Sequence, residues 1–337
     1  MNKIVELPLI DPVYSTYQDG IFSACIVENP TIRNYYLNEL MILACNRRFL
    51  SGYTSPGIRI LDTYYTNNPY LIKRGFDMRY LKGYANYVIR NLLDDGFYVY
   101  FWGVDDYYVE GKSWYKQRHF NHDGAICGYN REDKTYCIYA YDSRWINRKF
   151  WTPQKSFNAG LNAMFKKGCY GFICGMKPCD EIVEFSPQRA LSKIAEYLDS
   201  NMEKYSENCE GEVYGIVVHD YIAKYVEKLY DGSIPYERMD RRVFRMIWEH
   251  KKIMFERIQC IENALSLNDE ISKQYEPLVK VADTIRLLYA SHHSKRRDSV
   301  LPIIQNKLLY IKKEEERLLK LILEKARGIE NETVGLS

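Results

Sequence analysis

The sequence lacks several features that would assign it to a particular class of protein. Its 337 residues contain no apolar run near the roughly 20 residues of a membrane-spanning helix, so we expect no membrane contact. The first twenty residues lack the basic and apolar regions of a secretory signal, so we expect a cytoplasmic protein. Basic residues outnumber acidic ones only 47 to 44, an excess too small to predict nucleic-acid binding.

The nine cysteines include no C-x-x-C pair of the kind found in zinc or redox sites. Their odd number and scattered positions indicate reduced thiols rather than a disulfide framework. Cys169, Cys174 and Cys179 are evenly spaced, but no histidine lies close to them in the sequence. We therefore expect no metal site.

A chain of this length exceeds what a single hydrophobic core usually supports, so we expect two packed parts. Residues 1–185 mix helix and strand patterns and predict an α+β domain with early helices and an antiparallel sheet. Residues 186–330 have almost wholly helical periodicity and predict an all-α domain. Residues 331–337 form a tail.

The first part contains three helical and five strand-like segments. Apolar residues at three- and four-residue steps predict helices over 31–46, 78–94 and 154–166. Dense β-forming runs predict strands over 57–65, 97–104, 125–129, 135–141 and 169–176. The polar residues NREDK between 125–129 and 135–141 predict a hairpin.

The second part contains five helical segments, over 187–201, 212–230, 237–267, 278–290 and 300–327. The last of them has a near-heptad apolar pattern that Glu315 interrupts. A helical bundle packed within the chain is favoured, and an oligomer formed through this part stays open. The polar residues 201–212 predict a linker or an exposed loop.

Three residues have the order that thiol-dependent acyl transfer requires, namely a nucleophile, a base and a group that orients the base. Cys25 lies shortly before the helix predicted over 31–46, where the helix dipole would favour a thiolate. His122 precedes one strand of the hairpin, and Asp142 follows the other. Because these two ends of a hairpin are adjacent, we expect Asp142 to accept a hydrogen bond from His122.

His119 is an alternative base, because it lies only three residues before His122. It stands outside the clear strand pattern, which favours a surface role. A metal pair of His119 and His122 lacks partner ligands at suitable spacing.

The segment 104–143, VDDYYVEGKSWYKQRHFNHDGAICGYNREDKTYCIYAYDS, resembles the butirosin-biosynthesis acyltransferase branch of the papain-like cysteine protease superfamily. An early cysteine, a later histidine that enters a strand and a carboxylate one hairpin further on follow the order of that superfamily. Asp105, Asp106, Tyr107 and Tyr108 match a signature of the branch, and we interpret them as loop residues near the site. The whole chain is most similar to the amide-forming enzymes of closthioamide assembly.

The resemblance implies a papain-like core with Cys25 as nucleophile, His122 as base and Asp142 as the orienting group. It also implies that Gln18 donates to the oxyanion. Gln18 stands about one position further from the cysteine than the glutamine of the family, so the backbone N–H of Cys25 with another group is an alternative.

The implied reaction moves an acyl group from the phosphopantetheine thioester of an acyl or peptidyl carrier protein to an amine. The amine would be a small amine or diamine, such as 1,3-diaminopropane, and the chain would need no cofactor of its own. An acidic carrier protein could bind a group of basic residues, whose alternative role is a solvated helix face: Arg238, Arg241, Arg242 and Arg245.

Two functions of other classes stay open. A peptidase or amidase could use the same three residues, and its acyl group would pass to water. A papain-like scaffold could also bind a carrier protein without catalysis, and this would follow if Cys25 were buried or far from His122.

Overall fold

The computed structural model describes residues 4–15, 17–53, 55–61, 68–144, 146–166, 171–201 and 211–335. The chain divides into two compact units, Met1–Arg33 with Tyr64–Ile182, and Asn34–Thr63 with Val183–Ser337. We call these the sheet unit and the helical unit. The second transition lies close to the boundary expected after residue 185. The helical unit also includes residues 34–63, which the sequence analysis assigned to the first domain.

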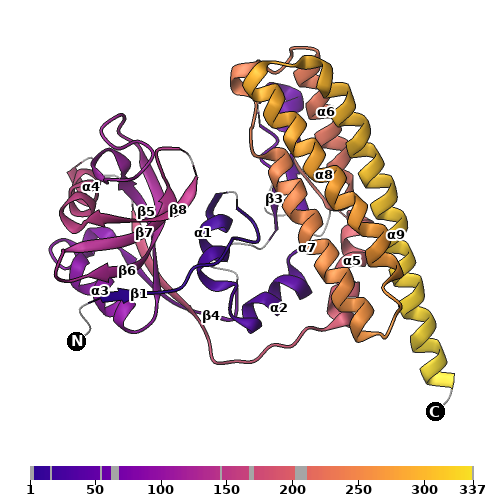
Figure 1. The fold of residues 1–337 in the computed structure, drawn as a ribbon, viewed down its shortest axis with the longest axis horizontal. Coiled ribbons are helices and arrows are strands. Elements are labelled where there is room, and N and C mark those ends of the chain that lie inside the picture. Colours follow the sequence, from indigo (N-terminus) through magenta and orange to yellow (C-terminus); the bar gives the residue numbers. More distant parts are fainter. Residues whose placement is uncertain are drawn as a thin grey trace. The chain divides into compact units, whose positions relative to one another are not determined.

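The sheet unit contains, within its described residues, a seven-stranded antiparallel sheet (Figure 1). The expected strands and hairpin between residues 97 and 141 are confirmed. β1 (Ile4–Glu6) pairs with the end of β6 beyond the reach of β5. The other strands follow in spatial order: β4 (Leu71–Asp77), β9 (Phe172–Pro178), β5 (Tyr98–Asp105), β6 (Asn121–Asn130), β7 (Thr135–Tyr141) and β8 (Asn147–Pro153).

Helices cover both faces of this sheet. On one face, α3 (Ala85–Asp94) and α4 (Gln154–Lys166) join the main apolar core. There the rings of Phe101 and Phe157 meet at 5.2 Å. Successive residues of a strand point to opposite faces, so Tyr100 faces the other side. Its ring lies 4.9 Å from that of Phe22 in α1 (Tyr17–Ile26), which places α1 on the second face.

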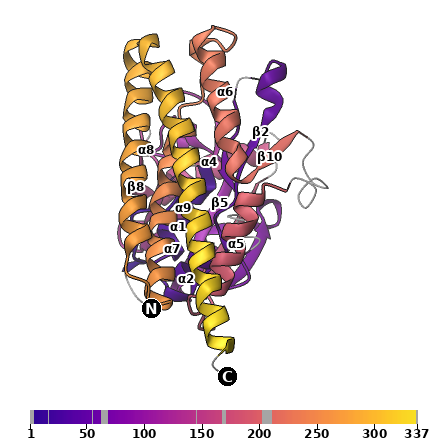
Figure 2. The same ribbon diagram turned by 90° about the vertical axis from the view of Figure 1, so that its right-hand side faces the viewer.

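The helical unit is built around long helices that lie side by side, as Figures 1 and 2 both show. They are α5 (Pro187–Asp199), α6 (Val218–Tyr230), α7 (Val243–Ala264), α8 (Glu270–Lys295) and α9 (Leu301–Gly335). No helix in the described ranges combines the length and apolar character needed to span a bilayer. Helices α5 to α9 confirm the expected C-terminal helical part.

The helical unit also contains a small sheet, so the expectation of an all-α second part is wrong. The strands run in the order β10 (Glu212–Tyr214), β2 (Leu43–Asn46) and β3 (Arg59–Ile60). The helix expected over 31–46 is therefore shorter, and α2 spans Pro30–Glu39. Residues 43–46 form a strand because they pair with residues 212–214, a contact between segments far apart in the sequence.

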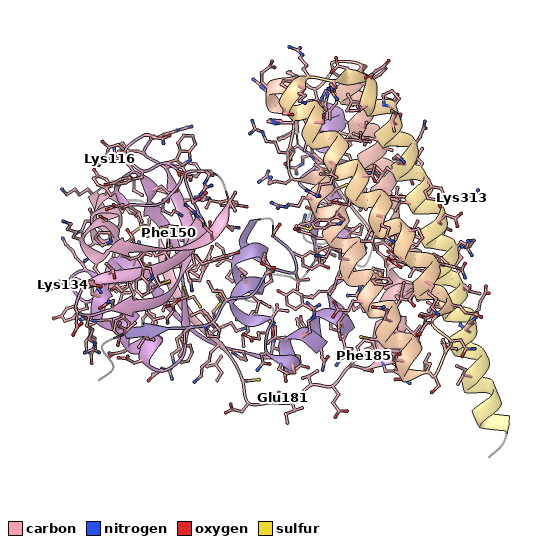
Figure 3. All side chains as sticks on the ribbon, in the orientation of Figure 1. Lys116, Lys134, Phe150, Glu181, Phe185 and Lys313 are labelled. Atoms are coloured by element: carbon pink, nitrogen blue, oxygen red, sulfur yellow. The ribbon has the colours of Figure 1, made fainter. Side chains whose placement is uncertain are left out.

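An extended segment leads from β9 to α5, and Figure 3 labels Glu181 and Phe185 on it. Within each unit, backbone carbonyls of this segment accept side-chain hydrogen bonds. Thr31 donates to the carbonyl of Glu181 at 2.7 Å in the sheet unit, and Asn34 donates to that of Val183 at 2.8 Å in the helical unit. The segment is thus held by specific contacts at both of its ends. Most of the loop expected over 201–212 lies outside the described residues.

A buried polar network joins five helices of the helical unit. Glu315 of α9 is fully buried and accepts from Lys251 Nζ of α7 at 2.6 Å, from Tyr197 of α5 at 3.0 Å and from Tyr275 of α8 at 2.5 Å. His219 Nε2 of α6 lies 3.8 Å from the same carboxylate. Burial opposes ionisation of Glu315, but the charge and hydrogen bond of Lys251, together with the nearby His219 and His250, outweigh burial and hold the pKa of the carboxyl below its usual range.

Two buried histidines of this network make the stability of the protein depend on pH. Burial lowers the pKa of His219 to about 3 and that of His250 well below its usual value, and the charge of Lys251 adds to both effects. The unfolded chain binds protons at these imidazoles below about pH 6.5, whereas the folded protein does not. Stability due to these groups is therefore present above that pH and is lost as the pH falls.

Lowering the pH from 7.5 to 5.5 is expected to reduce the free energy of unfolding by about 2–3 kcal/mol through the two histidines together. Urea titrations followed by circular dichroism at both pH values measure this difference. Replacing His219 by glutamine should flatten the pH dependence by about half. An equal pH dependence in the His219→Gln protein and the natural protein would contradict this account.

Candidate active site

His122 is the second residue of β6 and follows a polar loop. It lies opposite the end of β5. In the β5–β6 ladder it pairs with Val104, next to the pair of Asp105 and Asn121. After Asp105 the chain folds into a 3-10 turn, η3 (Asp106–Tyr108), because the Asp105 carboxylate accepts the backbone N–H of Tyr107 at 3.2 Å. This turn brings Asp106 beside the imidazole of His122.

Asp106 is the hydrogen-bond partner of His122. Its Oδ2 lies 3.1 Å from Nδ1 of the imidazole, and the carboxylate is fully buried. The buried Lys112 forms an ion pair with the other carboxylate oxygen at 3.1 Å and donates to the carbonyl of Asp123 at 2.6 Å. A buried carboxylate paired with a lysine favours the tautomer with the proton on Nδ1, which leaves Nε2 as an acceptor.

The second ring nitrogen of His122 faces another acidic group. Nε2 lies 3.6 Å from Oδ1 of Asp123, whose other oxygen accepts a hydrogen bond from Tyr100 at 3.2 Å. The imidazole stacks on Tyr141 at 5.9 Å and 7°. Its side chain is 20% exposed, so a small molecule can reach it, whereas Asp106 cannot be reached. This arrangement provides an oriented base beside a partly exposed carboxylate.

The expected contact between Asp142 and His122 is wrong. Asp142 instead forms an ion pair with Arg148, whose Nε lies 2.5 Å from Oδ2, and its Oδ1 accepts from the backbone N–H groups of Arg144 and Ile146 at 2.8 and 3.1 Å. Burial opposes its ionisation, but these N–H groups and the Arg148 guanidinium outweigh it and lower the pKa of the carboxyl. Asp142 therefore holds the turn between β7 and β8, a role that the aspartate of a tight turn often has.

Asp106 was predicted to be a loop residue near the site, although the sequence contains a signal for its contact with His122. The same adjacency of strand ends that was applied to the hairpin β6–β7 applies to β5 and β6, whose neighbouring ends carry Asp106 and His122. The sequence did not show on which side of His122 a carboxylate would lie. The register of the three strands decides this.

Cys25 occupies a position unlike the one expected. It is the ninth of ten residues in α1, near the C-terminal end of that helix, and only 4% of it is exposed. Burial raises the pKa of its thiol. The negative end of a helix dipole also disfavours a thiolate. Neither the helix position nor the environment activates this cysteine.

The structure does not bring Cys25 and His122 together. The carbonyl of Ala24 accepts from Ile10, and the segment before Ile10 contacts β6 through the bond from Leu7 N–H to the carbonyl of Cys127 at 2.7 Å. Burial raises the pKa of Tyr98, and the nearby thiols of Cys25 and Cys127 add to the effect. Tyr98 begins β5, whereas His122 pairs with its end, about 20 Å further along the strand at about 3.3 Å per residue.

The N-terminal turn of α1, rather than Cys25, lies near the end of the strands that carries His122. A Cβ on Gly20 would lie 3.1 Å from the side-chain nitrogen of Asn147. Asn147 pairs with Tyr141, whose ring stacks on His122. Gln18 belongs to this first turn of α1, but its side chain lies outside the described residues.

His119 forms a second pair of the same kind. Its Nδ1 lies 2.9 Å from Oδ2 of the buried Asp105, and its side chain is 50% exposed. The imidazole also stacks on Tyr107 at 4.3 Å. The alternative that His119 acts as the base therefore keeps a structural basis.

The seven cysteines at described positions are free thiols, and Cys169 and Cys209 lie outside those positions. Across the described ranges, no cluster of three or more His, Cys, Asp or Glu side chains could hold a metal ion. Of the arginine group, Arg242 and Arg245 form ion pairs with Asp240 and Glu249, which reduces the charge offered to a carrier protein.

No protein-family model matches the chain, and no curated protein matches it.

Proposed function

We propose that the sheet unit transfers an acyl group from a carrier-protein thioester to a small amine, with His122 as general base. The observation that carries this proposal is the 3.1 Å contact between His122 Nδ1 and the buried Asp106. A carboxylate in this position fixes the tautomer of a catalytic histidine and stabilises its protonated form. Asp106 therefore takes the orienting role that the sequence analysis assigned to Asp142.

The reaction is proposed to proceed by direct attack of the amine on the thioester. His122 Nε2 takes a proton from the amine while the amine nitrogen forms a bond to the thioester carbonyl carbon. The carbon–sulfur bond then breaks, and the thiolate of the carrier arm takes the proton from His122. The products are an amide and a free thiol. Cys25 stands outside this path because it is buried and lies toward the other end of β5.

Asp123 is proposed to bind the amine. Its carboxylate lies 3.6 Å from His122 Nε2 and is 13% exposed. An ammonium group at this carboxylate would place an amine next to the base. A diamine would suit the site well, since one end can be held as a cation while the other reacts neutral. Positively charged substrates are thereby favoured over water as the acyl acceptor.

The test is incubation with an acyl thioester of a carrier protein and 1,3-diaminopropane, with the amide measured by mass spectrometry. His122→Ala is expected to lower the rate by about 10²–10⁴-fold, the range for a general base. Asp106→Asn should lower it to a similar extent because the tautomer reverses. His119→Ala is the matched control and should change it little, as should Cys25→Ser. A larger loss in His119→Ala than in His122→Ala would overturn the assignment of the base.

Intact-protein mass distinguishes direct transfer to the amine from the covalent route through Cys25 that the resemblance implies. A mass increase that requires Cys25 and is discharged by the amine would show that an acyl-enzyme forms on this thiol. Release of free acid in place of amide would identify a hydrolase. Both outcomes contradict direct transfer to the amine.

The burial of Cys25 and its separation from His122 favour a second candidate function. In this case the papain-like scaffold binds an acylated carrier protein without turnover. Stable binding of the carrier protein with no amide and no acid released, in the natural protein and His122→Ala alike, would support this candidate over the enzyme.

A further inference from the structure

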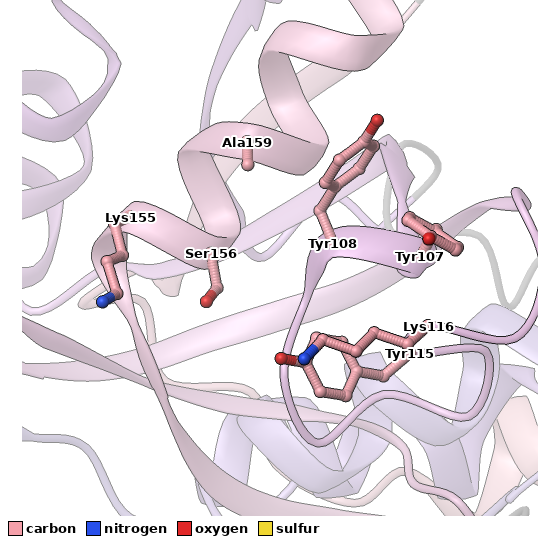
Figure 4. Close-up of a pocket in the computed structure, with 7 residues that line it drawn as sticks. All are labelled: Tyr107, Tyr108, Tyr115, Lys116, Lys155, Ser156 and Ala159. Carbon is pink, nitrogen blue, oxygen red and sulfur yellow. The ribbon is translucent and has the colours of Figure 1, made fainter.

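The sheet unit contains a cavity of about 620 Å³ between η3, the turn after it and the first turns of α4 (Figure 4). Its volume falls within the range of about 300–1,000 Å³ that is typical of small-molecule sites. Tyr107, Tyr108 and Tyr115 provide its aromatic surface. Lys116, Lys155 and Ser156 provide its polar groups.

The backbone that carries the aromatic surface is held in place by contacts within the chain. Lys116 donates its backbone N–H to the carbonyl of Tyr107 at 3.0 Å and adopts a φ of 55°, which non-glycine residues rarely adopt. The ring of Tyr107 stacks on His119 at 4.3 Å and meets the edge of Tyr108 at 5.1 Å. Because surrounding contacts maintain an unfavourable φ and a packed ring cluster, the shape of the cavity is preformed.

The polar groups of the cavity attract negative charge. In Figure 4 the hydroxyl of Ser156 faces the ends of Tyr115 and Lys116, with Lys155 further out on α4. The ammonium of Lys116 lies 5.1 Å from the ring centroid of Tyr115. The residues that line the cavity include two lysines and, within the described chain, no aspartate or glutamate. The lining therefore carries two positive charges with no lining carboxylate to neutralise them.

We propose that this cavity binds a small anion joined to a planar aromatic group. The anion, a phosphate or a carboxylate, lies between Lys116, Lys155 and the hydroxyl of Ser156. The aromatic group packs on the tyrosine rings, where offset or edge contacts are favourable. The cavity is a site distinct from the His122 pair, and the proposal does not depend on acyl transfer.

Isothermal titration of the full chain with phenyl phosphate and with benzoate tests the proposal and separates the two kinds of anion. At least one of them is expected to bind with a dissociation constant below about 1 mM. Phenol, which lacks the charge, and inorganic phosphate, which lacks the ring, should each bind at least about tenfold more weakly. The double replacement Lys116→Ala and Lys155→Ala should weaken binding by at least about tenfold.

Lys166→Ala is the matched control, because Lys166 is an exposed lysine at the opposite end of α4. It should leave the affinity unchanged, and circular dichroism should show that all variants remain folded. Equal binding of phenol and phenyl phosphate would overturn the proposal, as would an affinity that the double replacement leaves intact. Absence of binding by both anions up to about 10 mM would also overturn it.

Discussion

Replacing Glu315 by glutamine is expected to lower the free energy of unfolding by about 3–5 kcal/mol, the usual result of removing one partner of a buried ion pair. Lys251 would keep its charge in a fully buried position, with its carboxylate partner at 2.6 Å removed. Tyr197 and Tyr275 would also lose a charged acceptor. The loss is large because water cannot reach any of these groups. Urea unfolding followed by circular dichroism measures it.

The adjacent residue of the same helix provides a matched control. Glu316 pairs with Lys320 at 2.6 Å on an exposed surface, so Glu316→Gln should change stability by less than about 1 kcal/mol. The double replacement Glu315→Gln with Lys251→Met should be less harmful than the sum of the single replacements, because no charge is left unpaired. If Glu315→Gln were as stable as Glu316→Gln, the ion pair would not carry the stability assigned to it.

Replacing Arg257 by methionine is expected to cost about 3–5 kcal/mol, because hydrogen bonds from a charged donor contribute about 1.5–3 kcal/mol each. Arg257 is fully buried and donates through Nε to the carbonyl of Leu37 at 2.6 Å. Its Nη2 donates to the carbonyls of Tyr36 and Leu40 at 2.9 and 3.0 Å. Tyr36 and Leu37 lie in the last turn of α2 and Leu40 directly follows it, so Arg257 adds side-chain donors at a helix end where the backbone supplies few.

Arg257→Lys separates the charge from the geometry. A lysine keeps the positive charge at the end of the helix dipole but cannot reach three carbonyls with one ammonium, so it should recover only part of the loss. Arg317 is the control, since its side chain is 51% exposed and pairs with Glu314. Arg317→Met should change the unfolding midpoint in urea only slightly. A fully stable Arg257→Met protein would show that these carbonyls find other donors.

The segments with the strongest local patterns were predicted correctly. The run at 97–104 and the hairpin between 125 and 141 combine dense β-forming residues with a polar turn, and they are strands in the structure. The helix expected over 154–166 has the bounds of α4. Residues 43–46 were predicted wrongly as helix, because a short apolar run fits a buried helix or a strand equally well. Their partner, β10, lies about 170 residues further along the chain.

The sequence pattern identified Glu315 as an unusual position but did not predict its role. The sequence shows a charge that interrupts an apolar stripe, which by itself suggests a weak point in the helix packing. In the structure it is the acceptor for groups from α5, α7 and α8. Lys251 and Tyr197 come to it from separate helices, so only the packing of the bundle reveals the network.

At the candidate site, residue order and strand ends identified His122, because a histidine at the entry of a strand beside acidic residues is visible in the sequence. The choice between Asp106 and Asp142 depended on strand register and turn geometry. Asp142 is taken by Arg148 and two backbone N–H groups of its own turn, whereas η3 folds Asp106 onto the imidazole. The placement of Cys25 depended on where α1 begins and ends and on which part of it packs near Tyr98.

Local preferences along the chain determined that this protein has an antiparallel sheet with a strong central hairpin and a helical C-terminal part, because these preferences act between near neighbours. Tertiary packing alone decided that residues 34–63 join the helical unit, that Glu315 is buried with Lys251, and that His122 meets Asp106. Each of these depends on side chains brought together from distant segments, where burial makes a single hydrogen bond or ion pair decisive.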